Sequence, residues 1–305
     1  MGRLLLNCAL LLALVLGVLY ALAPRIQAGR VDSFYRRFTT APSRSLILGS
    51  SRAAQGLQPR VLEPALLQGG RYEGPLRNFA FTVMHSPYGP AYLAQVKKKL
   101  RPDTRHGLFL LAVDPWVLAV DSAERHDQRL RETQSFIGKL NFVSLNPNLE
   151  YLLRFWNHPL YQAFDLPDEQ LHLHADGWLE VDVPLDSLTV QGRIRSKLLS
   201  YRHMARTYTL SDERVRALAE TIAYLQGHGQ VVLVRLPVSA GMRELELRRW
   251  PRFDAVLGRL AARQHVPYLN YINRTAYPTS DGNHLQPEAG RRLSRQVALD
   301  ILQEL

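Results

Sequence analysis

Three side chains far apart in this sequence have the types that serine-based acyl chemistry needs. Ser51 follows a short aliphatic run and Gly49 in "LILGSSR", and Asp281 and His284 stand three positions apart in "SDGNHLQPEAG" near the other end of the chain. A histidine can take the proton of a serine hydroxyl, and a carboxylate can hold the imidazole in the tautomer that does so. The three residues therefore predict a nucleophile, its general base and the carboxylate that orients the base.

Each of these features alone also has an ordinary explanation. A serine after a strand can belong to a simple turn, Asp281 can cap a helix, and His284 can be a surface histidine. Their joint placement is more specific, because Ser51 follows the first expected strand and His284 precedes the last expected helix. In an open parallel sheet, active sites gather at the carboxyl ends of the strands. We therefore expect the three side chains to meet at that edge.

The elements that must position them alternate between strand and helix. Apolar runs predict strands at residues 45–48, 76–85, 107–116, 230–238 and 266–271. Helical patterns fall at residues 53–67, 91–100, 211–229, 252–265 and 286–305, and Ser211 is a helix cap. This alternation predicts an α/β fold, a three-layer α/β/α sandwich with a mostly parallel sheet.

Residues 119–207 interrupt this regular pattern. We interpret them as an irregular insertion or lid, with a hairpin at residues 171–183 that turns at Asp176 and Gly177. His172 and His174 alternate on that hairpin and could share a face as metal ligands, or they could simply be exposed. Tryptophans could stack on sugar rings or pack in the core or lid; they are Trp116, Trp156 and Trp178.

The N-terminus carries an apolar run, residues 4–23, in which only Asn7 is strongly polar. A helix of this length crosses a hydrocarbon core of ~30 Å. A cleaved signal peptide is the alternative, with a small-x-small site at residues 21–23, but Pro24 follows directly and disfavours cleavage. We expect an uncleaved anchor over residues 1–25, a stalk over 26–44 and one domain over 45–305.

Composition narrows the choice of partners. The formal net charge is +11, but the arginines are scattered and the only tight basic cluster is at residues 97–99, so nucleic-acid binding is not expected. The single cysteine, Cys8, lies in the apolar run, which excludes an internal disulfide and thiol catalysis in the domain. No cofactor and no metal is expected. Arg235 lies in an apolar strand and is expected to be paired in the core.

The two blocks around Ser51 and His284 resemble the first and last sequence blocks of the SGNH (GDSL-like) hydrolase superfamily. They look most like membrane-anchored bacterial members with a GSSR-type first block, of the kind found in teichoic-acid D-alanylation and polysaccharide O-acetylation. The resemblance implies a flavodoxin-like fold, Ser51 as nucleophile, and Asp281 and His284 as its partners. Ser50 stands where that family usually has an aspartate.

The two middle blocks depart from the family pattern, in which a glycine and an asparagine stabilise the oxyanion. The second block, "NFAFTVMHSPYG", has no glycine before Gly89, and residues that could line the site there are Asn78, Thr82, His85 and Ser86. In the third block Asp114 stands near the expected asparagine, and a carboxylate there would repel an oxyanion. The backbone N–H of Ser51 would remain as a donor. Arg52 could meet an anionic substrate group or form a structural ion pair.

The resemblance implies an acyl esterase or O-acyltransferase that acts on an acylated glycan or related envelope polymer. It also implies a single-pass protein of the bacterial inner membrane, with its domain in the periplasm or outside, beside a multipass membrane acyltransferase. The arginines after the apolar run favour the opposite orientation. Two alternatives stay open: a non-catalytic scaffold or glycan-binding component of a polysaccharide modification machine, and a membrane-bound lipase.

Overall fold

The computed structural model describes residues 2–28, 31–67, 70–124, 135–155 and 170–304. Five parallel strands form its central sheet, in the order β2–β1–β3–β8–β9. Their bounds are β1 Ser45–Leu48, β2 Leu76–Asn78, β3 Gly107–Ala112, β8 Gly229–Arg235 and β9 Tyr268–Asn270. The second strand lies on one side of β1 and the later strands lie on the other side, which is the order of flavodoxin-like doubly wound sheets. The predicted fold class is confirmed.

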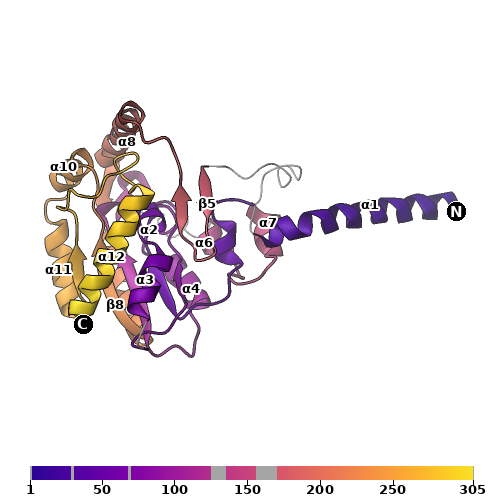
Figure 1. The fold of residues 1–305 in the computed structure, drawn as a ribbon, viewed down its shortest axis with the longest axis horizontal. Helices are drawn as coiled ribbons and strands as arrows, with labels where there is room; N and C mark the ends of the chain where they lie inside the picture. The colour runs from indigo at the N-terminus through magenta and orange to yellow at the C-terminus, as the bar shows by residue number, and fades with distance from the viewer. Residues whose placement is uncertain (1, 29–30, 68–69, 125–134, 156–169, 305) are drawn as a thin grey trace.

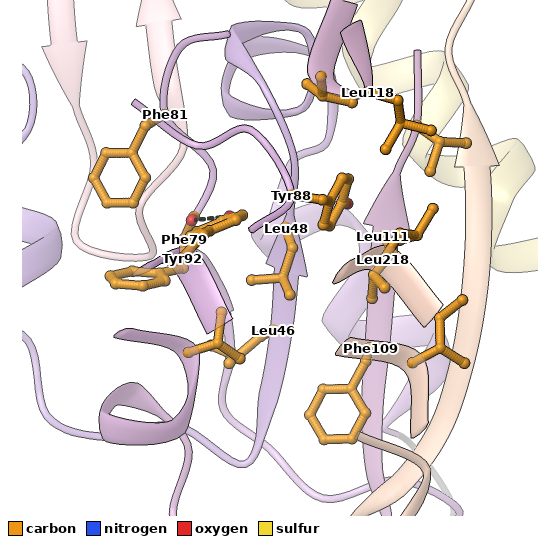
Figure 2. Packing of buried hydrophobic residues seen from close by; sticks show 14 of the residues in the cluster. Leu46, Leu48, Phe79, Phe81, Tyr88, Tyr92, Phe109, Leu111, Leu118 and Leu218 are labelled. Carbon is orange, nitrogen blue, oxygen red and sulfur yellow. Dashed lines mark hydrogen bonds between the residues drawn. The ribbon is translucent and has the colours of Figure 1, made fainter. Parts of the chain in front are cut away.

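The central strands are continuous apolar runs because both faces of the sheet are covered. Every residue of β1 and β3 is buried. Successive side chains point to opposite faces, so Leu46 and Leu48 join one core cluster while Ile47 joins another. Figure 2 shows the first cluster, in which the Tyr92 hydroxyl donates to the Phe79 carbonyl at 2.7 Å.

Helices cover the two faces (Figure 1). One face is covered by α2 Ser51–Gly56, α3 Pro59–Leu66 and α12 Pro287–Glu304. The other is covered by α4 Pro90–Lys99, α9 Asp212–Gln226 and α11 Phe253–Gln264. The Ser211 side chain accepts from the N–H of Arg214, so the predicted cap of α9 is confirmed.

The segment 119–207 is more regular than expected. Its hairpin is confirmed, with Gly177 at φ 86° in the turn. The described elements of this part are β4 Ala119–Asp121, η3 Ser122–Glu124, α6 Phe136–Lys139, α7 Leu149–Phe155, β5 Leu171–Leu173, β6 Leu179–Val181 and α8 Ser187–Thr207. The long helix α8 was missed by the sequence analysis, as was α10 Ala240–Arg249. After α8 comes β7 Tyr208–Leu210, which pairs with β4 in antiparallel fashion.

Part of the expected stalk belongs to the folded body. The short 3₁₀ helix η1 Tyr35–Phe38 buries Tyr35, Arg37 and Phe38, and Phe38 stacks on Phe81 with ring centroids 5.3 Å apart. The Lys99 ammonium donates to the carbonyl of Arg37 at 2.8 Å, which ties this segment to α4. Residues 35–38 of the predicted stalk therefore belong to the core, where their aromatic side chains pack.

The N-terminal helix α1 Gly2–Gln27 extends away from the rest of the molecule (Figure 1). Leucines in its first two-thirds are exposed; Leu4, Leu11 and Leu14 have 63–67% of their surface accessible. Leu22, near the other end of the helix, is buried. Among the described residues, one helix, Gly2–Pro24, is long and apolar enough to cross a membrane.

Candidate active site

The turn between β1 and α2 presents Ser51 at the first position of a helix. Gly49 has φ 140°, and a Cβ there would lie 2.8 Å from the Cβ of Ala112, so only glycine allows this close approach of the turn to β3. Ser50 is the N-cap residue of α2, and Ser51 begins the helix. The strand, the glycine and the cap together fix the direction in which the Ser51 side chain leaves the backbone.

Asn78, at the end of β2, holds α2 in place. Its Nδ2 donates to the carbonyls of Ala53 at 2.8 Å and Leu57 at 2.9 Å, and its Oδ1 accepts from the N–H of Ala80. Both amide groups are thereby used within the fold. Asn78 thus supports α2, and its amide is not free for the oxyanion site at which the sequence placed it as a candidate.

The loop before α12 folds back on its own aspartate. Asp281 Oδ1 accepts from the N–H groups of Asn283 and His284, both at 2.9 Å. Gly282 has φ 87°, and Ser280 N–H donates to the His284 carbonyl at 2.9 Å. This tight turn is the reason that an Asp-x-x-His spacing places the carboxylate beside the ring of its own histidine.

The structure brings Ser51, His284 and Asp281 together, as the sequence predicts. Ser51 Oγ lies 2.7 Å from His284 Nε2, and His284 Nδ1 lies 2.8 Å from Asp281 Oδ2. The side chains of His284 and Asp281 are 12% and 13% exposed. The arrangement has the geometry in which an imidazole can take a hydroxyl proton while a carboxylate steadies it.

Asp281 is held as a carboxylate. Burial acts to raise its pKa, but the hydrogen bond and charge of His284, the Asn283 N–H and the Lys197 ammonium outweigh burial and keep that pKa well below its usual range. Lys197 Nζ lies 3.2 Å from Asp281 Oδ2. An ionised Asp281 is what the orientation of His284 requires.

Lys197 comes from α8 and was not found by the sequence analysis. Arg193 on the same helix donates to the Ser280 carbonyl at 3.1 Å, and Tyr201 packs edge-on against Trp116 with ring centroids 4.6 Å apart. These three residues follow one another at steps of four, which places them on one face of α8. This spacing of four is the sequence feature by which the face could have been recognised. The face covers the loop that carries Asp281.

Arg52 lies in the interior, which favours the structural alternative for this residue. Its Nη2 is 2.5 Å from Glu246 Oε1, and its Nε and Nη2 donate to Asn283 Oδ1 at 2.9 and 2.7 Å. Burial acts to lower the pKa of Arg52. The charges of Glu246 and Asp114 and the hydrogen bond to Glu246 outweigh burial, so the pKa of Arg52 is raised. Glu246 also contacts Arg235, whose expected pairing in the core is confirmed.

Both carboxylate oxygens of Asp114 accept hydrogen bonds from within the fold. Oδ1 accepts from the N–H groups of Trp116 at 2.9 Å and Val117 at 3.2 Å, at the start of η2 Pro115–Val117. Oδ2 accepts from Ser50 Oγ at 2.9 Å. The two serines of the first block are therefore distinct, because Ser50 faces Asp114 and Ser51 faces His284.

The candidates of the second block have contacts of their own. Ser86 is buried and its hydroxyl donates to the Gly49 carbonyl at 2.7 Å, so it supports the β1–α2 turn. Thr82 Oγ1 lies 2.7 Å from His85 Nδ1. The His85 ring stacks on Phe136 at 4.4 Å, and burial lowers the pKa of His85. The side chains of Thr82 and His85 are thus paired with each other.

The hairpin residues pack against the fold. His174 Nε2 lies 2.7 Å from Glu180 Oε2, and its ring stacks on Trp178 at 4.6 Å. Trp178 Nε1 donates to the Gln55 carbonyl at 2.8 Å, which favours packing over sugar stacking. Trp116 is buried in the core, and Trp156 lies outside the described residues. Within the described part of the chain, no group of three or more His, Cys, Asp or Glu could hold a metal ion.

Comparison with known proteins gives matches to solved structures alone. No protein-family model matches the sequence, and no curated protein does. Est24, a carbohydrate acetylesterase from Sinorhizobium meliloti, is similar with 10% identity and a TM-score of 0.41, over 86% of this chain and 100% of that one. An inhibitor-bound aryl esterase from M. smegmatis has 10% identity and a TM-score of 0.39 over the same shares. Similarities this distant assign neither an activity nor a substrate.

Proposed function

We propose that this protein is a serine esterase in which Ser51 is the nucleophile, His284 the general base and acid, and Asp281 the carboxylate that orients His284. The observation that supports this proposal is the chain of contacts from Ser51 Oγ to His284 Nε2 at 2.7 Å and from His284 Nδ1 to Asp281 Oδ2 at 2.8 Å. These distances lie within hydrogen-bond reach, the geometric requirement for general-base activation of a serine.

The reaction has two stages. Ser51 Oγ attacks the ester carbonyl carbon as its proton passes to His284 Nε2, and the carbonyl electron pair moves onto oxygen. When the tetrahedral intermediate collapses, the bond to the leaving alcohol breaks and His284 returns the proton to that alcohol. An acceptor hydroxyl, from water or from a sugar, then attacks the acyl-Ser51 ester with the same proton transfers and frees the serine.

One oxyanion donor is available from the helix itself. The backbone N–H of Ser51 is at the first position of α2, where an N–H has no acceptor within the helix. It sits on the residue that bears the nucleophile, so it can donate to the oxygen of a carbonyl attacked by Ser51. Asp114 is turned to Ser50 and to η2, which argues against the scaffold alternative that its charge had suggested.

We further propose that the acyl group belongs to a glycan or related polymer of a bacterial envelope, and that the acceptor is a glycan hydroxyl or water. In this proposal α1 is an uncleaved membrane anchor, the domain lies in the periplasm or outside the cell, and a multipass membrane acyltransferase works beside it. The length and exposed leucines of α1 support the anchor. The resemblance of the first and last blocks to membrane-anchored SGNH proteins supports the substrate class and the partner.

Hydrolysis of p-nitrophenyl acetate by the full-length protein in detergent tests the esterase. We expect the protein to release nitrophenol and Ser51→Ala to reduce kcat by at least about 10³. Ser50→Ala is the matched control, because it removes the neighbouring hydroxyl and leaves that of Ser51. Equal activity in both variants would contradict the assignment of Ser51, and an inactive wild-type protein would favour the scaffold. Hydrolysis rates with acetylated sugars and with long-chain esters distinguish the proposed enzyme from a lipase. Faster hydrolysis of the long-chain esters would favour the lipase.

A further inference from the structure

Asn283, the neighbour of His284, has a side-chain amide of fixed orientation. Its Oδ1 accepts from Arg52 Nε at 2.9 Å and from Arg52 Nη2 at 2.7 Å. A guanidinium only donates hydrogen bonds, so the amide oxygen must face Arg52 and the amide nitrogen must face the other way. Asn283 Nδ2 lies 3.1 Å from His284 Nε2, the same atom that lies 2.7 Å from Ser51 Oγ.

The group that sets this orientation is itself rigidly held. The Arg52 and Glu246 side chains are 4% and 0% exposed, and they form an ion pair. Glu246 also accepts from Trp116 Nε1 at 2.9 Å and from Arg235 Nη2 at 3.1 Å. A rotation of the Asn283 amide would place its NH₂ group against this buried guanidinium, so the N–H stays directed at His284 Nε2.

The partner of this N–H changes during the reaction. When His284 Nε2 acts as the base, it carries a single lone pair. The Ser51 hydroxyl, at 2.7 Å, and the Asn283 amide N–H, at 3.1 Å, then share that lone pair. When Nε2 takes the proton of Ser51, it becomes a donor and no longer accepts from the amide. At the same moment the carbonyl oxygen of the substrate, bonded through carbon to Ser51 Oγ, gains a negative charge.

We propose that Asn283 Nδ2 then donates to this oxygen and is the side-chain amide of the oxyanion hole. It would supply, from the residue before His284, the donor that Asp114 does not offer. The interaction forms with charge that exists only in the transition state and tetrahedral intermediate, and such interactions increase kcat. This inference rests on the proposed esterase function.

Two variants test it in the full-length protein. Asn283→Ala removes the amide, and Asn283→Asp keeps the shape and an oxygen for Arg52 but offers no N–H. We expect each to lower kcat for p-nitrophenyl acetate by roughly 10²–10³ with little change in KM. Affinity for a boronic acid should fall by a similar factor, because its adduct with Ser51 carries a negatively charged oxygen. Asn141→Ala, which removes an exposed amide bonded to Glu150, should leave both unchanged.

The outcomes separate the two proposals. If the wild-type protein is active, Ser51→Ala is inactive and both Asn283 variants keep kcat and boronic-acid affinity, the oxyanion role is overturned and the esterase stands. If the variants only melt at lower temperature, with unchanged kcat per active site titrated, Asn283 is structural and the inference is also overturned. If the wild-type protein has no esterase activity, the proposed function fails first and the inference fails with it.

Discussion

At the scale of single residues, two adjacent serines have different tasks. Ser50 donates to Asp114 and caps α2, whereas Ser51 lies against His284. The sequence could predict Asp281 and His284 as a pair, because a four-residue turn fixes their relation locally. It could not predict the orientation of the Asn283 amide, because that depends on Arg52, which is 231 positions away in the chain.

Asp281→Asn tests the orienting carboxylate. We expect kcat to fall by about 10⁴ with KM nearly unchanged, because an amide can favour the wrong tautomer of His284 and cannot stabilise an imidazolium by charge. Steady-state kinetics at pH 7 measures this loss. Asp103→Asn, which alters an exposed ion pair with Arg44, is the control. A loss below tenfold would contradict the role of Asp281.

Asp281→Asn should also change how the free energy of unfolding depends on pH. The pKa of Asp281 is held below its usual range in the folded protein. Its stabilising effect is therefore fully present above the unfolded-state pKa of about 3.9 and is lost as the pH falls toward the folded-state value. We expect the difference in unfolding free energy between wild type and Asp281→Asn to narrow by about 1 kcal/mol between pH 6 and pH 3. Urea unfolding at both pH values measures it, and a constant difference would be the contrary result.

At the scale of elements, the helix α8 is the one that the sequence pattern shows least. Ala205 is its only buried described residue, so the helix lacks the broad apolar stripe by which core helices are recognised. Helices such as α9, which cover the sheet, have that stripe and were predicted. The helix α8 covers the Asp281 loop with polar and aromatic side chains. These contacts join segments far apart in the chain, so the sequence pattern does not predict them.

Lys197→Met tests the contact between α8 and the proposed active site. The ammonium lies 3.2 Å from Asp281 Oδ2 and opposes the charge that would stabilise a protonated His284. Without it we expect the acidic limb of the kcat/KM profile to move to higher pH by roughly half a unit, the size of a partly exposed ion pair. Lys197→Arg should restore the wild-type profile. A limb that stays in place, or moves to lower pH, would refute this electrostatic role.

At the scale of the whole molecule, the three layers follow from the sequence because each central strand is a continuous apolar run between helical patterns. The start of the folded body is harder to predict from the sequence. Residues 35–38 look like part of a polar stalk, but Tyr35 and Phe38 pack into the core. Glu246 could not be predicted as the partner of Arg52 and Arg235, because the helix α10 that carries it was not recognised. In addition, Arg52 and Glu246 are 194 positions apart in the chain.

The proposed anchor should attach the whole chain to the membrane. We expect the protein to stay with membranes during alkaline carbonate extraction. The double variant Leu11→Arg, Leu14→Arg should be released, because each arginine near a helix centre costs about 2.5–3.5 kcal/mol on insertion. Leu302→Arg, on the exposed face of α12, is the control. Recovery of a mature chain that begins after Ala23 would instead identify a cleaved signal peptide.

Covalent labelling tests whether the imidazole of His284 activates the Ser51 hydroxyl beside it. The full-length protein should react with a fluorophosphonate, and peptide mass spectrometry should place the adduct on Ser51. Labelling should persist in Ser50→Ala and vanish in Ser51→Ala, and it should be strongly slowed in His284→Ala. Absence of labelling in the wild-type protein, or an adduct on another residue, would contradict the assignment of Ser51 as the nucleophile.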